Sequence, residues 1–327
     1  MVRALKAAGE PTRLRILLLL HRSELTVGEI QQILGQSQPR VSRHLRLLSE
    51  AGLLNRHSEG SNVFYQWARD GFASRFLRSI HTLGDPDEPL IRRDQTRLAQ
   101  IRANRAELAA RTLAGIETER SVLAHHTAHD ETVEAQIIDA LGPQPNGVLL
   151  DIGTGTGRMI ELLSPSCERA IGIEPSREML NLARTRLDSV GLDHYELRQG
   201  NAYDLDMEPC SVSLAVLHHV LHFLDEPGRA VDEVGRTVEH NGRLLIIDFA
   251  AHNIEDLRLS HNHRRLGFTE QEVVDWCTSA GFDAVETRHI SAPTHHRGQD
   301  GLVVSIWVAT RSHTPNHPAP PHTEMTQ

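Results

Sequence analysis

The stretch LLDIGTGTG, residues 149–157, decides the fold of the larger part of this chain. Its apolar residues predict a buried strand, and its glycines allow a sharp turn in which the backbone approaches a ligand without interference from a Cβ. A dinucleotide-binding GxGxxG fingerprint counted from Gly153 would need glycine at the position of Arg158, so that spacing fails. The stretch therefore predicts a strand, a ligand-binding turn and a helix over 158–163, but not the dinucleotide fingerprint.

Strand and helix patterns alternate along the rest of this region, up to residue 311. Such alternation implies an α/β domain with a parallel sheet covered by helices on both faces, and ligands bind at the carboxyl ends of its strands. Thr269 and Glu272 are placed to cap the helix over 268–282. The last two strands are expected to pair with each other. The expected strands after the turn are RAIGIE, YELRQG, SVSLAVL, RLLIIDF, AVETRHIS and GLVVSIWVATR, with a further helix over 177–190.

This pattern resembles the class I S-adenosylmethionine (SAM) methyltransferases, whose hhDxGxGxG loop matches residues 149–157. The resemblance extends to Arg311 and implies a Rossmann-like fold that binds SAM or S-adenosylhomocysteine (SAH). In that family the glycine loop and its aspartate surround the amino-acid part of the ligand, and Glu174 would hold the two ribose hydroxyls. Residues implied to bind the cofactor are Asp151, Gly153, Thr154, Gly155, Gly157, Glu174, Pro175, Asn201, Ala202, Leu217 and His218.

The adenine end departs from the family pattern at one position. Asn201 stands where the family usually has an aspartate that accepts a hydrogen bond from the adenine N6 amine, and its amide oxygen can accept the same bond. Pro175 would pack on the adenine, and Leu217 and His218 would form the wall near the sulfonium.

The methyl-acceptor side carries no motif that identifies a substrate. The D/N-PP-Y/F motif of DNA amino-methyltransferases is missing after the fourth strand, so the catalytic residues stay unknown. Methyl transfer depends mainly on alignment of the reactants, so the lack of a recognisable base decides nothing. Candidate substrate-side residues are His218, His219, His222, His252, His261, His263, Arg264 and Arg265.

The first 84 residues predict four helices followed by a β-hairpin. Gly9-Glu10-Pro11 separates the first two helices, and Thr26 with Glu29 forms a capping-box pattern for a third. The fourth helix begins near Pro39 and buries a stripe of Val41, Leu45 and Leu48. A hairpin around residues 59–61 then places a wing after a helix-turn-helix. The exposed face of the fourth helix, predicted to bind DNA, carries Gln38, Arg40, Ser42, Arg43 and Arg46.

This region, about residues 2–80, resembles the ArsR-family winged-helix repressors. The resemblance implies a homodimer that binds a double-stranded DNA operator. Many members release DNA when a metal or metalloid binds, but Thr26 and Gly28 replace the cysteine pair of the commonest metalloid site, and His81 stands alone where another site would need spaced ligands. We therefore expect no metal site.

Charge and composition agree with two domains that bind different partners. The chain has 327 residues and a net charge of −9, yet the part up to Gly84 has 12 basic against 6 acidic residues, a net +6, which leaves −15 for the remainder. A basic N-terminal part joined to an acidic remainder indicates that only the N-terminal part binds a polyanion. The longest apolar run, Ile16 to Leu20, is too short for a membrane span, and there is no signal-peptide pattern. Three scattered cysteines also favour the cytoplasm.

The expected division is a winged helix-turn-helix domain over 1–84, a helical linker over 85–130, a methyltransferase-like domain over 131–311 and a disordered tail over 312–327. Two functions are consistent with it. The first is a DNA-binding regulator that uses SAM or SAH as effector or cosubstrate, with control of methionine-cycle genes suggested by similar fusions. The alternative is an active small-molecule methyltransferase with an autoregulatory DNA-binding domain. The operator, the methyl acceptor and the sign of the response to ligand stay open.

Overall fold

The computed structural model describes residues 1–311 except 22, 61, 69, 70, 86, 125–129, 144–146, 256, 259–262 and 292–301. Of residues 113–124, 130 and 131 only the backbone is described. The predicted disordered tail over 312–327 lies outside the described residues.

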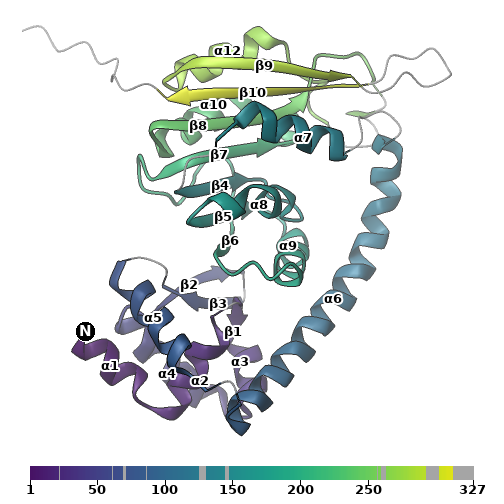
Figure 1. Ribbon diagram of the computed structural model, residues 1–327. Coiled ribbons are helices and arrows are strands. Elements are labelled where there is room, and N and C mark those ends of the chain that lie inside the picture. The colour runs from purple at the N-terminus through teal and green to yellow at the C-terminus, as the bar shows by residue number, and fades with distance from the viewer. Residues whose placement is uncertain are drawn as a thin grey trace, which may run out of the picture.

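The N-terminal region has the predicted winged helix-turn-helix arrangement (Figure 1). Its short strand β1 pairs with β3, which pairs with β2 to form the hairpin. Thr26 and Glu29 form the predicted capping box, and Gly35 ends α3 in a left-handed conformation. The elements are α1 Val2–Ala8, α2 Pro11–Leu19, β1 Leu25–Thr26, α3 Val27–Leu34, α4 Gln38–Glu50, β2 Leu54–Glu59, β3 Asn62–Trp67 and α5 Gly71–Leu83.

A helix of 36 residues, α6 Pro89–Ala124, connects the two regions and packs on both (Figure 1). Asp94 is buried against α2, where its carboxylate accepts two hydrogen bonds from Arg15 at 2.6 and 2.7 Å. Further along, Arg105 donates to Glu29 of α3 at 2.7 Å and also lies 3.8 Å from Asp188 of the C-terminal region. The linker is therefore a packed helix that contacts both regions.

The C-terminal region is a seven-stranded sheet in the order β6-β5-β4-β7-β8-β10-β9. The first five of these strands are parallel, whereas β10 runs antiparallel to β8 and to β9, as the sequence predicts for the last pair. The strands are β4 Val148–Ile152, β5 Arg169–Glu174, β6 Tyr195–Gln199, β7 Val212–His218, β8 Val238–Phe249, β9 Phe282–Ser291 and β10 Val303–Arg311. The predicted α/β fold class is confirmed.

Helices cover both faces of this sheet, and each face has its own apolar core. Thr269 and Glu272 form the predicted capping box at the start of α12. The helical elements are α7 Asp130–Leu141, α8 Arg158–Leu163, η1 Ser164–Ser166, α9 Arg177–Ser189, η2 Leu221–Phe223, α10 Pro227–Thr237 and α12 Glu270–Ser279. No helix in the described part of the chain is long and apolar enough to cross a membrane.

Candidate functional site: a cofactor cavity and a buried domain contact

A cavity of about 640 Å³ opens at the carboxyl ends of β4, β5, β6 and β7. This is where the strand order reverses, because β4 lies between β5 and β7. Its volume is in the usual range for a small-molecule site. Nine of the predicted cofactor-binding residues line it, namely Asp151, Gly153, Thr154, Gly155, Glu174, Pro175, Asn201, Ala202 and His218.

The other two predicted residues, Gly157 and Leu217, are not among those that line the cavity. Gly157 is the N-cap of α8 and faces Ala183 and Leu187 of α9, so it allows close helix packing. Leu217 is fully buried in the core on one face of the sheet. Side chains alternate across a strand, so the neighbour His218 faces the cavity in its place.

The glycine turn after β4 is shaped by its backbone and by Glu174. Gly153 and Gly155 have φ of 71° and 53°, values that other residues rarely adopt. The Glu174 carboxylate accepts hydrogen bonds from the backbone N–H groups of Gly155 and Ser176, each at 3.0 Å. Burial raises the pKa of Glu174 although these N–H groups oppose the shift. Glu174 thus ties the turn to the start of α9.

Asp151 is the most deeply buried acid of the cavity, with 1% of its surface exposed. Its Oδ2 accepts a hydrogen bond from the Thr154 hydroxyl at 2.6 Å, while its Oδ1 has no hydrogen-bond partner among the described residues. Burial raises the pKa of Asp151 to about 7; the charge of Glu174 adds to this and the Thr154 hydroxyl opposes it. The site is therefore suited to a cationic group, which would satisfy the open oxygen and favour the carboxylate.

The end of the cavity that the sequence predicts to bind adenine is more open. Asn201 is exposed, and its side-chain oxygen accepts a hydrogen bond from the N–H of Tyr203 at 2.8 Å. An amide oxygen has two lone pairs, so the second can still accept from an adenine amine. Gln199 donates to the carbonyl of Pro175 at 3.0 Å and so links the ends of β5 and β6.

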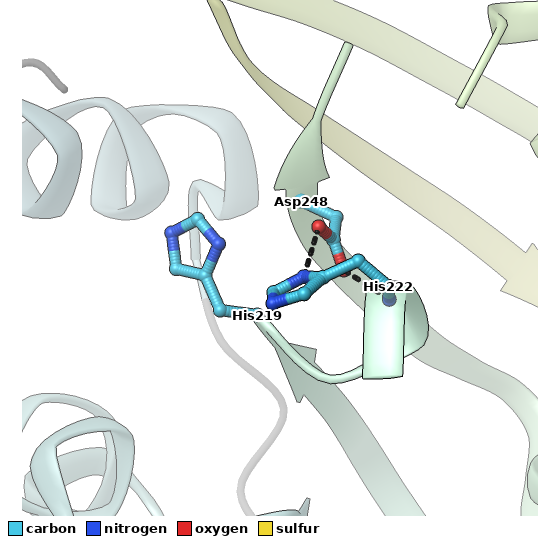
Figure 2. A group of neighbouring side chains, drawn as sticks. All are labelled: His219, His222 and Asp248. Carbon is cyan, nitrogen blue, oxygen red and sulfur yellow. Dashed lines mark hydrogen bonds and ion pairs between the residues drawn. The ribbon is translucent and has the colours of Figure 1, made fainter. Parts of the chain in front are cut away.

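The opposite end of the cavity collects histidines. His218, His219, His222 and His263 all line it. His222 donates through Nδ1 to Oδ1 of Asp248 at 2.7 Å, because a carboxylate oxygen only accepts, and both side chains are buried (Figure 2). Sequence analysis did not predict a role for Asp248, because it is part of the expected apolar strand RLLIIDF. A single carboxylate near the end of an apolar strand, together with a histidine-rich segment elsewhere in the domain, was the signal that could have identified it.

Several other substrate-side candidates do not line this cavity. Arg264 pairs with the Asp225 carboxylate, and Arg265 donates to the carbonyl of Asp225 at 3.0 Å. His252 accepts a hydrogen bond from the N–H of Ile254 through Nδ1 at 3.2 Å. His261 lies outside the described residues.

The predicted DNA-binding face of α4 is open. Gln38, Arg40, Arg43 and Arg46 are exposed, and Ser42 is half-buried. The stripe of Val41, Leu45 and Leu48 on the other face is fully buried.

Arg184 of α9 makes a buried contact between the two regions, with 1% of its surface exposed. Its Nε donates to Glu24 Oε2 at 3.1 Å, its Nη2 donates to Glu59 of the wing, and its guanidinium carbon lies 3.8 Å from the ring centroid of Phe64. The other oxygen of Glu24 accepts from the N–H of Leu197, on the edge strand β6, at 3.2 Å. These residues, Glu24, Glu59, Phe64 and Arg184, are called the Arg184 cluster below.

Ionisation in the Arg184 cluster is uneven. Burial raises the pKa of Glu24, although His57 and Arg184 oppose the shift. The pKa of Glu59 is lowered despite burial, because His57 and Arg184 lie beside it. His57 Nε2 is 3.3 Å from Glu59, and these acids raise the pKa of His57 although burial opposes them.

A second cavity of about 380 Å³ lies between wing strand β2 and the C-terminal region. Gly200, in the loop after β6, lines both this cavity and the cofactor cavity. At the wing tip, Gly60 has φ of 57°, and a Cβ there would collide with the guanidinium of Arg177 on α9. The wing therefore packs against the same loop and helix that border the cofactor cavity.

Comparisons with known proteins agree with this division. Residues 10–56 match the bacterial regulatory protein, arsR family, and residues 150–246 match a methyltransferase domain. The chain is 33% identical over 79 residues to the biofilm growth-associated repressor of Agrobacterium fabrum, which is 24% of this chain and 67% of the repressor. It is 29% identical over 103 residues to the uncharacterized methyltransferase YcgJ of Bacillus subtilis, 32% of this chain and 41% of that protein.

A solved chain from the complex between the Haloferax volcanii Trm112 methyltransferase activator and a methyltransferase has the same fold as the C-terminal region. The TM-score is 0.51 at 18% identity, covering 62% of this chain and 97% of that one. The chain spans about half or less of the length of the first curated relatives it matches. Taken with the winged helix and the cofactor cavity, these matches show that the chain belongs to the ArsR family of regulators in its N-terminal region and carries a methyltransferase domain in its C-terminal region.

Proposed function

We propose that this protein is a transcriptional regulator, a repressor by analogy with its ArsR relatives, whose methyltransferase domain binds SAM or SAH and thereby changes DNA binding. The observation that carries the proposal is the Arg184 cluster. It joins the wing to α9, the helix that begins beside Glu174 at the cofactor cavity. We propose domain limits of 1–84 and 131–311, with 85–130 between them.

The cavity supports a sulfonium cofactor with an amino-acid part. The open oxygen of Asp151 suits the ligand's ammonium group, and the lone pairs left on Glu174 suit a ribose diol. Pro175 and Ala202 offer apolar surface beside them. The apolar wall and few polar groups are typical of cofactor sites.

The wing supports control of DNA binding by the second domain. A winged helix commonly binds DNA through its recognition helix in the major groove and its wing beside it. Here the recognition helix α4 is exposed, whereas Glu59 and Gly60 of the wing pack against α9. Full engagement of the wing with DNA therefore requires a change at the Arg184 cluster. A ligand that binds Glu174 and the Gly200 loop contacts one element on which the wing rests and lies beside the start of the other, α9, so it can favour one arrangement over the other.

A homodimer fits the surface of the DNA-binding domain. Exposed apolar side chains gather on its outer helices, with Val2 and Leu5 on α1 and Phe72 and Leu83 on α5. Such patches on a soluble domain mark interaction surfaces. We propose that a second copy covers them, which would present two α4 helices to successive major grooves of an operator.

Control of methionine-cycle genes and a cytoplasmic location complete the proposal. The first rests on analogy with similar fusions. The second rests on the need of a regulator to reach DNA. A second candidate function is methyl transfer to a small molecule, which the buried His222–Asp248 pair favours.

The test measures both ligands and DNA with the full-length protein. An operator duplex is first selected from a random library, and its affinity is measured by fluorescence anisotropy for the ligand-free, SAM-saturated and SAH-saturated protein. Calorimetry gives the ligand affinities. The proposal expects that at least one ligand binds and changes operator affinity about 5–150-fold. Binding of neither ligand would remove the cofactor role, and equal operator affinity in all three states would remove the regulatory role.

A further inference from the structure

The cofactor cavity has two chemically different ends. The end formed by the glycine turn, Glu174 and Asn201 is polar and is assigned to SAM in the proposed function, on which this inference rests. The other end is walled by apolar and aromatic side chains and holds the histidines. The apolar residues there are Val133, Ile137, Phe223, Leu224, Phe249 and Val304. With SAM assigned to the polar end, the chemistry of the second end suits another molecule.

His222 is held in one orientation at this end. Asp248 accepts hydrogen bonds from the Phe249 N–H at 2.8 Å and from the backbone N–H of His222 at 3.3 Å, and its Oδ1 also lies 2.7 Å from Nδ1 of the His222 ring. Burial raises the pKa of Asp248, but His222, His219 and these hydrogen bonds bring it below its ordinary range. A carboxylate only accepts hydrogen bonds, so this contact places a ring proton on Nδ1 and leaves Nε2 as the nitrogen that can act as a base.

The neighbouring rings restrict His222 further. The His263 ring lies 4.2 Å from the His222 ring between centroids, and the Phe249 ring lies at 5.3 Å. The His219 ring lies 6.0 Å from the His222 ring between centroids. The backbone of His219 has φ of 55°, a left-handed value that is costly for a residue other than glycine. Figure 2 shows His219 on the loop after β7, His222 on the short helix η2 that follows, and Asp248 at the end of strand β8. Backbone strain of this kind is concentrated at functional sites.

We propose that His222, oriented by Asp248, is the general base of a methyl-transfer reaction, and that its substrate is a small, flat, apolar molecule with a weakly acidic hydroxyl. The hydroxyl oxygen forms a bond to the methyl carbon of SAM, the carbon–sulfur bond breaks, and its electron pair stays on the sulfur of SAH. The hydroxyl proton moves to Nε2 of His222. Asp248 stabilises the resulting imidazolium until water takes the proton. The apolar wall selects the flat body of the substrate.

A divalent metal is the rival occupant. One ligand atom each from His219, His222 and Asp248 lies within 4.8 Å of the other two. Both Asp248 oxygens already accept hydrogen bonds, and one of them holds His222 Nδ1. A metal bound between these residues would have to displace the hydrogen bond that orients the ring. The geometry therefore favours a base, and metal dependence is an outcome of the test.

The test uses two acceptors of the same shape that differ in acidity, phenol and thiophenol. Full-length protein is incubated with SAM carrying a labelled methyl group under mildly alkaline conditions, where thiophenol is largely a thiolate and phenol keeps its proton. The variants are His222→Asn and Asp248→Asn, and the exposed His240→Ala is the control. SAM and SAH affinity is measured by calorimetry for each protein, and ring ¹⁵N NMR reports which nitrogen of His222 is protonated.

The wild type should methylate phenol, and His222→Asn should lower that kcat about 100- to 10,000-fold, the usual contribution of a general base. In His222→Asn, transfer to thiophenolate and SAM affinity should stay unchanged. The control His240→Ala should methylate phenol as the wild type does. Asp248→Asn should shift the His222 proton away from Nδ1 in the NMR spectrum and slow phenol methylation.

Several results would overturn this inference. Transfer to neither acceptor by a wild type that binds SAM would remove the methyl-acceptor site while leaving the cofactor role intact. Equal loss with both acceptors in His222→Asn would make the residue structural. Activity that is lost with a chelator and restored by a divalent metal would assign the cluster to a metal ion. Failure of SAM to bind would remove the methyl-transfer reaction, and failure of both SAM and SAH to bind would contradict the proposed function as well.

Discussion

Arg184 of the methyltransferase domain lies 3.1 Å from Glu24 of the DNA-binding domain, and both side chains are almost fully buried. The two residues are 160 positions apart in the sequence. A charge pair removed from water is costly to separate, because each partner left behind would be an uncompensated buried charge. The contact therefore favours one discrete arrangement of the wing relative to the cofactor cavity, and a change of that arrangement must break the pair.

Replacement of Arg184 tests this contact directly. Arg184→Met leaves Glu24 and Glu59 without their shared cation, so the free energy of unfolding should fall by about 3–5 kcal/mol. Urea unfolding measures the loss, and hydrogen exchange should rise in the wing over 54–67. The control is Arg186→Met on the same helix, whose side chain is 39% exposed and pairs with Glu161 at 3.6 Å. That change should cost about 1 kcal/mol or less. Equal stability of both variants would contradict a stabilising role for the Arg184 cluster.

The exposed face of α4 should read DNA. Arg43→Ala removes a guanidinium able to bind a guanine edge or a phosphate, so operator binding should weaken by about 1–3 kcal/mol while SAM binding stays the same. Fluorescence anisotropy at matched salt measures the change. Arg111→Ala, an exposed change on α6, serves as the control. Unchanged operator affinity in Arg43→Ala would remove α4 from the recognition role.

Glu174 should be required for both forms of the cofactor. Glu174→Ala removes the acceptor of a ribose diol and also frees the N–H groups of Gly155 and Ser176, so SAM and SAH should both weaken by about 1–3 kcal/mol. Glu174→Gln keeps one acceptor oxygen and should weaken them less. Thermal-shift titrations compare the three proteins, and equal ligand stabilisation in all of them would rule out contact with the ribose.

Local signals predicted most of the fold and named nine residues that line one cavity. The capping box of Thr26 and Glu29 and the glycine turn at 153–157 depend on residues a few positions apart, so the sequence contains the whole interaction. Leu217 lies in the core and does not line the cavity for a related reason. One step along a strand moves a side chain to the other face, and a pattern that locates a strand end to within a residue cannot choose between Leu217 and His218.

Contacts between distant segments could not be predicted in the same way. Nothing near Arg184 in the sequence distinguishes it from other arginines of an amphipathic helix, because its partners Glu24 and Glu59 belong to another domain. Asp248 was missed because its partner His222 is 26 residues away and its own strand is apolar. The individual contacts of the linker could not be predicted either, because Arg105 of α6 meets Glu29 and Asp188, which are far from it in the sequence.

Ligand binding should depend on pH through Asp151. Its pKa is about 7 in the free protein, so below that value the carboxyl is protonated, whereas an ammonium group at the open oxygen favours the carboxylate. Binding of SAM must then release a proton at acidic pH, and affinity should rise with pH until about 7 and level off above it. Calorimetry in buffers of different ionisation enthalpy measures the released proton. Asp151→Asn should bind more weakly and lose this pH dependence, and proton release that persists in the variant would assign it to another group.

Binding of operator and binding of ligand should affect each other equally. If SAM or SAH changes operator affinity by some factor, operator DNA must change ligand affinity by the same factor, about 5–150-fold in typical cases. Calorimetric titration of ligand into the protein with and without operator checks this equality independently of any structural assumption. Unequal factors would mean that one measurement reports something other than binding.

The Arg184 cluster should carry a large part of this coupling. In Arg184→Met the wing is released from α9, so the operator and ligand should each bind with an affinity that no longer depends on the other. The exposed Arg229→Met on α10 is the matched control and should keep the full factor. If Arg184→Met kept it as well, the signal would have to pass through α6, whose Arg105 contacts Glu29 on one side and Asp188 on the other. Arg105→Met would then be the variant that uncouples the sites, and retention of coupling in the double variant would show that neither contact transmits it.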